Sequence, residues 1–493
     1  MKKVFLFTGL SVVSFLVITS FIKKQSLVTD YLSAGKTVFC PVPVPAVASS
    51  AFVPSYSPAA VMIRKNIYSY SAADIASLKA GINAMKALPV TDVTSWQYQA
   101  AIHGTTLTNN LPLWNSCQHY TPFFYSWHRM YLYFFERILR AKSGNPNLTL
   151  PYWDYQTNAV LPPDYRNSAA GNPLYDGSRN GSINAGGALS SSIMTSFNNS
   201  LTDIPFYDFQ NDIQGPHGSV HVAIGGNMGS VPTAALDPCF WLHHTNIDRL
   251  WEVWLRKCGG RSDPKTDTSW MNKQFTFYNE TGAAVVMTGS QVVSTAASLN
   301  YRYDLPLKFR CGIIIKWWLW YWKWWELMRL PHPIIINQQI AKVSFRDTPT
   351  DSLKIFMQQT KTASFNFSLT DIPDKLYIQL EDIKIEKMPE GVVEVYLNLK
   401  PGEVPKSSSP SFAGVLDLFA VSAHNHNAEN NNNLRLNIST AARNLGLKVA
   451  DLRAAEFTFY VRGNTLKGRE IKTEAAIQAG SVVIGVEKAG KQR

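Results

Sequence analysis

The sequence predicts two structural units, a mainly α-helical domain over residues 61–305 and an antiparallel β-sandwich domain over residues 341–493. In the first unit, apolar residues recur at helical spacing between polar loops. In the second, short segments such as "LYIQLEDIKIEKM", "VVEVYLNLK", "FAGVLDLFAV" and "EFTFYVRG" alternate apolar with polar residues, as half-buried strands do. Residues 306–340 follow neither pattern and are expected to be a linker.

Composition and charge are those of a globular protein. The chain has 493 residues, of which 45% are hydrophobic and 17% charged, so it can bury a large core and is not of the disordered class. The formal net charge is +12, but the Lys and Arg residues are scattered and form no dense basic run. We therefore expect no nucleic-acid partner.

The chain begins with an export signal over residues 1–25, in which lysines flank the apolar run Val4–Ile22. The run is close to the ~20 residues that cross a bilayer, and no clear small-x-small cleavage site follows it. We expect a cleaved signal, with an uncleaved membrane anchor as the alternative. Both place the mature domain outside the cytosol, secreted or periplasmic. Residues 26–60, rich in Pro, Ala, Ser and Val, are expected to form an extended leader.

Three helix starts are marked by residues that cap helices. Ser71 is a predicted N-cap with Asp74 three residues later. Thr121 is the expected N-cap of a helix with Pro122 at its first position, and Asp237 is placed in the same way before a proline. The five cysteines are too few and too scattered for a disulfide framework.

The expected linker contains six of the fourteen tryptophans, all within Trp317–Trp325. Lys316, Lys323 and Glu326 argue against a membrane span, and a surface aromatic patch of this size would favour aggregation. A third interpretation is a frameshift. Trp has the single codon TGG, and a one-base shift turns a run of TGG codons into Gly codons, so the authentic segment would be a flexible Gly/Asn linker. Resequencing the source DNA decides this question.

Seven of the ten histidines lie between positions 103 and 244, and three of them form a first set. His103 ends the short helix "SWQYQAAIHG". His128 shares a helix face with Phe124 and Tyr131, so it should point into the core. His119 lies between the two helices in "SCQH".

A second set follows in "PHGSVHVAIGG" and "DPCFWLHHTNIDRLW". His217 and His221 are four residues apart, so both imidazoles project from one helix face and can bind one ion. His243 and His244 are adjacent, and neighbouring helix residues point about 100° apart, so one wall of a site seats only one of them. For a single histidine a satisfied core residue is the simpler interpretation. Six in helix cores, without thiolates or a carboxylate triad, favour a borderline metal such as copper.

These motifs, together with "LPYWDY", resemble those of the tyrosinases and catechol oxidases, the type-3 copper polyphenol oxidases, over roughly residues 60–260. The C-terminal segments "EVYLNLK" and "FAGVLDLFAV" are similar to the β domain of plant polyphenol oxidases. The resemblance implies a four-helix bundle that holds two copper ions. It assigns one ion to His103, His119 and His128 and the other to His217, His221 and His244.

The resemblance also implies a reaction: with O2 as co-substrate, small o-diphenols are oxidised to o-quinones and monophenols are hydroxylated more weakly. His243 would then lie beside the second copper site or in the substrate pocket. Phe240, one turn before His244, would stack on the phenol, and Asp248, one turn after it, would orient an imidazole. A haemocyanin-like oxygen carrier is the alternative, and a structural or pigment-binding protein is a third class. The sequence predicts no oligomeric state.

Three further expectations come from the resemblance. Hydroxylating relatives carry an Asn after the first ligand of the second copper, where it holds a water that acts as base. Gly218 stands there, with Asp212 as the nearest upstream acid, so diphenol oxidation should dominate, and Gly218→Asn should raise the hydroxylase share. Cys117, two residues before His119, is expected to form a thioether with it, the alternative being a buried thiol. The C-terminal domain is expected to cover the site.

Overall fold

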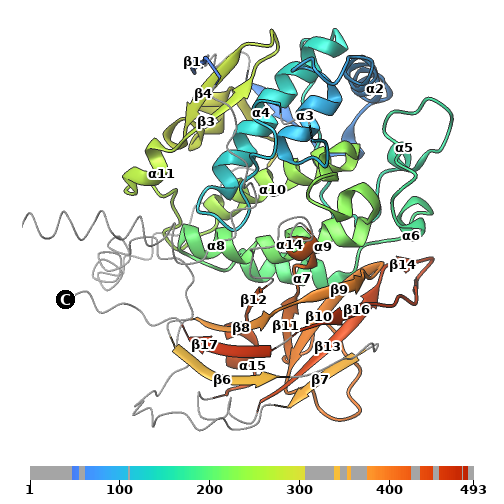
Figure 1. The fold of residues 1–493 in the computed structure, drawn as a ribbon, viewed down its shortest axis with the longest axis vertical. Coiled ribbons are helices and arrows are strands. Elements are labelled where there is room, and N and C mark those ends of the chain that lie inside the picture. The colour runs from blue at the N-terminus through green and yellow to red at the C-terminus, as the bar shows by residue number, and fades with distance from the viewer. Residues whose placement is uncertain are drawn as a thin grey trace, which may run out of the picture.

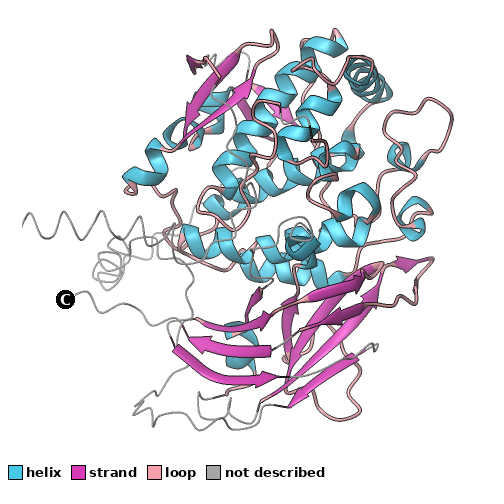
Figure 2. Ribbon diagram, in the orientation of Figure 1, coloured by secondary structure: helices cyan, strands magenta, loops and turns pink. Residues whose placement is uncertain are grey.

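The computed structural model describes most of the chain, with most of the helices in one part and most of the strands in the other (Figures 1 and 2). The described residues are 47–54, 61–108, 111–305, 338–344, 352–356, 375–422, 433–447, 455–479 and 481–486. The export signal, the possible anchor and the Trp-rich segment fall outside these residues, so those expectations and the frameshift stay predictions.

The N-terminal part is a bundle of helices with a few short ones at its surface. The longer helices are α2 (Ala72–Lys86), α3 (Trp96–His103), α4 (Phe124–Ser143), α7 (Ser191–Ser200), α8 (Phe206–Asp212), α9 (Gln214–Ile224) and α10 (Pro238–Arg256). The short ones are α5 (Pro163–Arg166), α6 (Gly181–Asn184), α11 (Thr268–Asn272) and α12 (Thr295–Leu299). This part confirms the expected mainly α fold class.

Two of the three predicted helix starts are confirmed. Ser71 accepts a hydrogen bond from the backbone N–H of Asp74 at 3.2 Å, and the Asp74 carboxylate accepts one from the N–H of Ser71 at 3.0 Å. This reciprocal pair satisfies two backbone donors that would otherwise have no partner. Asp237 caps α10 by accepting from the N–H of Cys239 at 2.7 Å, with Pro238 in the first turn.

The predicted start of α4 is wrong. The helix begins at Phe124, and Thr121 is not its N-cap. The backbone carbonyl of Thr121 accepts from the Gln210 side chain at 3.1 Å, and that of Pro122 accepts from the Trp270 indole at 2.8 Å. These distant side chains bind the two carbonyls, so tertiary contacts override the local capping signal.

Short paired strands connect the first and last segments of the helical part. In one sheet β1 (Ser50–Ala51) runs parallel to β4 (Ala284–Thr288), which is antiparallel to β3 (Gln274–Tyr278). The expected extended leader therefore contributes a strand. A second pair joins β2 (Met62–Arg64) in parallel to β5 (Tyr301–Tyr303). This pair brings Arg64 and the two tyrosines of β5 beneath the helices that carry the histidines.

Asp248 of α10 lies at the centre of a buried charge network. Its carboxylate accepts from Arg129 of α4 at 2.5 Å and from Arg64 at 3.3 Å. The hydroxyls of Tyr301 and Tyr303 each donate to it at 2.6 Å. Burial raises the pKa of Asp248, but the two guanidinium groups outweigh burial, and the net shift is downward. The carboxylate therefore stays charged and ties α10 to α4 and to both ends of the domain.

This network corrects the expectation that Asp248 orients an imidazole. Both carboxylate oxygens are taken by Arg64, Arg129 and the two tyrosines, and no hydrogen bond to a histidine occurs among the described residues. Asp248 does lie on the helix face predicted from its position one turn after His244. Two buried arginines lie beside it there, and a guanidinium group binds a carboxylate more strongly than a neutral imidazole does.

The C-terminal part confirms the expected antiparallel β-sandwich. One four-stranded sheet has the order β12 (Leu434–Asn437), β8 (Leu376–Glu381), β17 (Ser481–Val486), β6 (Gln338–Ser344). The other has the order β11 (Phe412–Val415), β10 (Gly391–Leu397), β13 (Glu456–Gly463), β7 (Ser352–Phe356). Minor elements are β9 (Lys384–Lys387), β14 (Thr465–Leu466), β15 (Arg469–Glu470), β16 (Ala476–Gln478), α14 (Leu418–Ser422) and α15 (Ser439–Asn444).

The segment "FAGVLDLFAV", predicted as one strand, is divided in the structure. β11 ends at Val415, and the short helix α14 begins at Leu418. Asp417, between them, accepts a hydrogen bond from the backbone N–H of Ala420 at 3.3 Å and so caps the first turn of α14. The alternation of apolar residues did not reveal this N-cap.

The β domain packs against the helical part along α7, α8 and α9 (Figure 1). Asn464 donates to the carbonyl of Ala223 at the end of α9, at 2.9 Å. The backbones of Thr465 and Ala188 exchange hydrogen bonds at 2.6 and 2.9 Å. At the far end Asn437 donates to Asp212 at 2.7 Å. α9 therefore lies between the helical bundle and the β domain.

Among the described residues, no helix is long and apolar enough to cross a membrane.

One cysteine, Cys258, is disulfide-bonded, and the spacing of the cysteines did not predict this bond.

We expect Asp248→Asn to lower the free energy of unfolding by about 3–5 kcal/mol, because it leaves two buried guanidinium groups without their carboxylate. Since the pKa of Asp248 is lowered in the folded protein, its contribution is present above the ordinary Asp range and is lost as pH falls through the lowered pKa. Urea denaturation of the copper-free protein, followed by tryptophan fluorescence, measures the change without a contribution from metal.

Asp164→Asn is the matched control for this substitution. Its partner Lys79 lies at 3.0 Å, but the two side chains are 42% and 28% exposed, so the loss should stay below about 1 kcal/mol. Equal losses in the two variants would show that the buried network is not needed for stability.

Candidate metal centre

The first set of predicted ligands meets at one point. His103 is the last residue of α3, His128 lies in the second turn of α4, and His119 lies in the loop between these helices. One ligand atom of each ring lies within 4.8 Å of the others. The three residues are at most 3% exposed. The histidines that the sequence placed near each other therefore do meet, although His119 is not on a helix.

The second set meets on α9 and α10. His217 and His221 project from one face of α9, as their four-residue spacing predicts. The Nε2 atom of His244 lies 3.4 Å from Nε2 of His217 and 3.3 Å from Nε2 of His221. Two ligand nitrogens about 2.0 Å from one tetrahedral ion are about 3.3 Å apart, so this spacing fits a shared metal ion.

Backbone carbonyls orient several of the imidazole rings. Nδ1 of His128 lies 2.8 Å from the carbonyl of Phe124, and Nδ1 of His221 lies 2.9 Å from the carbonyl of Met228. Nδ1 of His103 lies 3.2 Å from the carbonyl of Val231. A carbonyl only accepts, so Nδ1 carries the proton and Nε2 keeps its lone pair. Nε2 of His103 and of His128 has no hydrogen-bond partner among the described residues, as expected of a ligand atom.

Burial keeps these imidazoles neutral. It lowers the pKa of His103, His119, His217, His221 and His244 well below the ordinary value, and neighbouring histidines lower it further. For His128 burial lowers the pKa to about 3. Neutral imidazole is the form that binds a metal, so both clusters are ready to bind at neutral pH.

The two clusters lie side by side. The rings of His128 and His244 are stacked with centroids 4.6 Å apart and planes within 9°, and those of His119 and His217 are 5.7 Å apart. One cluster offers three neutral imidazoles and the other four, His243 included, and among the described residues neither has a carboxylate or thiolate ligand. This donor set fits two copper ions at neighbouring positions.

His243 and Phe240 border this centre on α10. His243 belongs to the same close group as His217 and His221, and its ring stacks on that of His217 at 5.1 Å and 18°. The Nε2 contacts described above nevertheless belong to His244. Phe240 is fully buried, with its ring 4.1 Å from that of His244 and 4.8 Å from that of His103. It therefore braces two predicted ligands, and its contact with a phenol stays a prediction.

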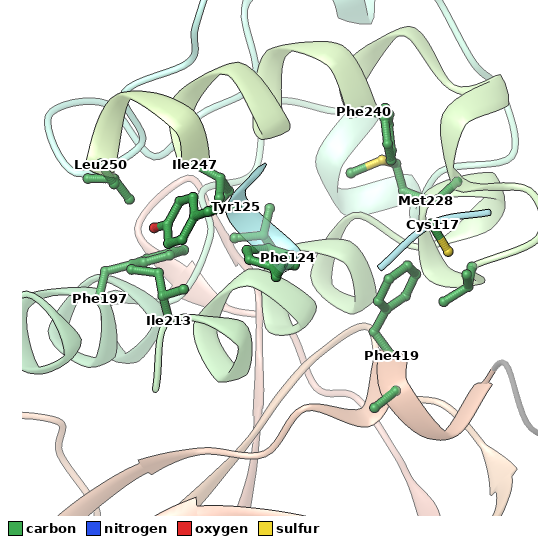
Figure 3. Packing of buried hydrophobic residues seen from close by; sticks show 14 of the residues in the cluster. Cys117, Phe124, Tyr125, Phe197, Ile213, Met228, Phe240, Ile247, Leu250 and Phe419 are labelled. Atoms are coloured by element: carbon green, nitrogen blue, oxygen red, sulfur yellow. The ribbon is translucent and has the colours of Figure 1, made fainter. Parts of the chain in front are cut away.

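Sequence reasoning missed a residue that covers the centre. Phe419 of α14 projects from the β domain toward the helices that carry Phe124 and Phe240 (Figure 3). Its ring stacks on His221 with centroids 4.0 Å apart and planes within 7°. It also meets the rings of His119 and His217 nearly edge-on, each at 6.0 Å. No spacing rule connects Phe419 to ligands some two hundred residues earlier in the chain, so the sequence held no usable signal.

The remaining predicted site residues lie next to the ligands. Gly218 of α9 faces Asp417, which is 5% exposed. Burial raises the pKa of Asp417 well above its ordinary value. Cys117 is 1% exposed and lies two residues before His119, where its thioether stays a prediction.

Three family models match most of the chain. The common central domain of tyrosinase matches residues 93–211 and 187–257, and the polyphenol oxidase middle domain matches 265–312. A domain of unknown function (DUF7868) matches 332–484. Residues 313–331, which hold the Trp-rich run, lie between the last two matches.

Curated relatives match over the helical part. A tyrosinase of Hahella sp. (strain CCB-MM4) is 34% identical over 294 residues, which are 49% of this chain and 62% of that protein. Polyphenol oxidase II of Ipomoea batatas, named as chloroplastic, is 30% identical over 325 residues, 54% of this chain and 55% of that protein. The chain thus spans about half the length of the curated relatives that it matches.

Solved structures share the fold of both parts. A latent apple tyrosinase aligns with a TM-score of 0.56 at 22% identity, covering 88% of this chain and 100% of that one. A latent aurone synthase, a polyphenol oxidase, aligns with a TM-score of 0.57 at 21% identity, covering 92% of this chain and 95% of that one. From the family models and relatives that match the helical part, and from its paired histidine clusters, we conclude that this part of the chain is a type-3 copper domain of the tyrosinase and polyphenol oxidase family.

Proposed function

We propose that this chain is a phenol oxidase that uses O2 to oxidise o-diphenols to o-quinones and hydroxylates monophenols more weakly. Two diphenols lose two electrons and two protons each, and one O2 takes them up to give two waters. The observation that carries the proposal is the pair of buried imidazole clusters, one of three rings and one of four, each with its ligand atoms close together. When bound, two copper ions supply the electron transfer between phenol and O2.

The protein's own part is to hold the ligands and to exclude water. We propose His103, His119 and His128 for one ion and His217, His221 and His244 for the other. The carbonyl contacts at Nδ1 fix three of these rings before metal arrives, which reduces the rearrangement that binding requires. The apolar surroundings keep the centre dry.

The place of the substrate ring is suggested by Phe419. Its ring already occupies a slot that stacks on His221 and meets His119 and His217 edge-on, which are the two arrangements that aromatic rings prefer. We propose that a phenol takes this slot when Phe419 leaves it. The contact of Phe240 with a phenol, expected from the resemblance, stays a prediction beside this one.

The proposed preference for diphenols rests on the lack of a side chain at Gly218 that could hold a water acting as a base. A monophenol with a pKa near 10 must lose its proton to bind copper, and Gly218 offers no acceptor for a water that would take it. The nearest upstream acid, Asp212, accepts from Asn437 instead, and burial raises its pKa to about 6. Diphenols are more acidic and chelate the metal, so they depend less on such a base.

We further propose that the C-terminal domain keeps the enzyme latent. In the structure α14 places Phe419 on His221, so a phenol and the domain compete for one space. Both solved relatives above are described as latent forms, which for this chain is support by likeness of fold only.

Copper content and oxygen uptake test the function together. We expect two copper ions per chain, O2 consumption with dopamine, and slow or lagging turnover of tyramine. The quinone is followed by its visible absorbance after the linker is cut by a protease. Copper binding with no uptake on either phenol would favour the oxygen carrier. Equal rates on both phenols without a lag would contradict the stated preference.

Substitution of the paired histidines tests the ligand assignment. His244→Ala should lower the copper content from two ions to one and abolish turnover, because it removes one of three imidazoles from its ion. His243→Ala, at the adjacent residue, is the matched control. This variant should keep both copper ions and change the KM for the diphenol. Metal analysis of the purified variants, with circular dichroism to confirm folding, measures this. Loss of copper in the His243 variant would show that the assignment is wrong.

Substitution of Phe419 tests the latency. An aromatic pair is worth about 0.5–1.5 kcal/mol, so Phe419→Ala should raise diphenol oxidation by the uncut enzyme roughly 2- to 12-fold. The rate is compared with that of wild-type enzyme before and after cleavage of the linker. Phe412→Ala, in β11 with its ring on that of Tyr396, is the control. An unchanged uncut rate in the Phe419 variant would argue that α14 does not limit access.

A further inference from the structure

The face of α9 next to its histidine ligands is built for close approach of the β domain. Gly215, Gly218 and Ser219 face the segment that leads from β11 into α14. The Ser219 hydroxyl lies between two carbonyls, that of Gly215 in its own helix at 3.0 Å and that of Leu416 at 3.2 Å, and so contacts this segment directly. The segment therefore lies on α9 at backbone distance.

At Gly218 the approach leaves no room for a side chain. A Cβ atom there would lie 1.7 Å from Oδ1 of Asp417, 2.3 Å from Cγ and 2.8 Å from Oδ2. Carbon atoms in ordinary contact are about 3.5–4.0 Å apart, so an added methyl group would overlap the whole carboxyl group. At Gly215, one turn earlier, a Cβ would lie 3.6 Å from the carbonyl of Val415, which is ordinary contact.

Asp417 cannot yield without disturbing its surroundings. It is 5% exposed, and its carboxyl group accepts from the N–H of Ala420, which caps α14. The side chain is short, so moving Cγ requires rotation about χ1 and loss of this cap. The preceding Leu416 is fixed by Ser219 on one side and by a backbone bond to Val393, at 2.9 Å, on the other. A displacement at Asp417 is therefore passed to α14 and to Phe419.

We infer that Gly218 is the position that permits the β domain to close over the metal centre, and that any side chain there opens it. The inference rests on the proposed latency, and it identifies the contact between Gly218 and Asp417 as the one that allows the closed state. One consequence concerns Gly218→Asn. That substitution, predicted to favour monophenols, should also displace the domain, so its effect on specificity can be measured only against an opened wild-type enzyme.

The test measures domain closure and not turnover. We expect Gly218→Ala in the full chain to raise the open fraction roughly 5- to 150-fold, the range of an overpacked core. Hydrogen–deuterium exchange of peptides from α9 and α14 reports the opening, and the radius of gyration from small-angle scattering confirms it. Gly215→Ala is the matched control on the same helix and should exchange as wild type does.

A second variant separates steric overlap from a folding defect. Asp417→Ala removes all three atoms that the added methyl group meets but also the cap of α14, so the double variant is compared with Asp417→Ala alone. Adding Gly218→Ala to Asp417→Ala should leave the exchange of α9 and α14 unchanged. Wild-type exchange in Gly218→Ala, or an opening by Gly218→Ala that is equally large with and without Asp417, would overturn the inference. Because no readout involves phenol, these results stand apart from the test of phenol oxidation.

Discussion

The burial of neutral imidazoles is the constraint on which the rest of the structure depends. Seven histidine rings at 3% exposure or less can remain in an apolar core only if they are uncharged, because a buried charge without a partner costs several kcal/mol. Desolvation enforces neutrality, and carbonyls at Nδ1 decide which nitrogen keeps its lone pair. The helices must then hold each imidazole ring in a fixed position within the core. Asp248 and its two arginines supply that rigidity between α4 and α10.

The sequence predicted what depends on local periodicity. The spacing of His217 and His221, the adjacency of His243 and His244 and the cap at Asp237 all follow from the geometry of one helix, and each was placed correctly on its element. Contacts between distant segments could not be read in this way. The start of α4 was misplaced because Gln210 and Trp270 bind the carbonyls of Thr121 and Pro122, just before the helix, from elsewhere in the fold.

Asp248 and Phe419 show the same limit at the site itself. Asp248 was assigned to the correct face of α10, but three of its four partners lie on β2 and β5, at opposite ends of the helical domain in sequence. Phe419 belongs to a segment whose alternating pattern indicated a strand, and its proximity to His221 exists only once the two domains are packed together. Side-chain type and spacing find the ligands of a site. They do not find the residues that a second domain brings to it.

The helix α9 holds His217 and His221 on one face and receives the β domain on the neighbouring face. With the domain in place, the ligand rings have almost no contact with solvent, and the ring of Phe419 lies against His221. We therefore expect copper to enter more readily while α14 is away from α9, so that metal loading precedes closure as the protein matures.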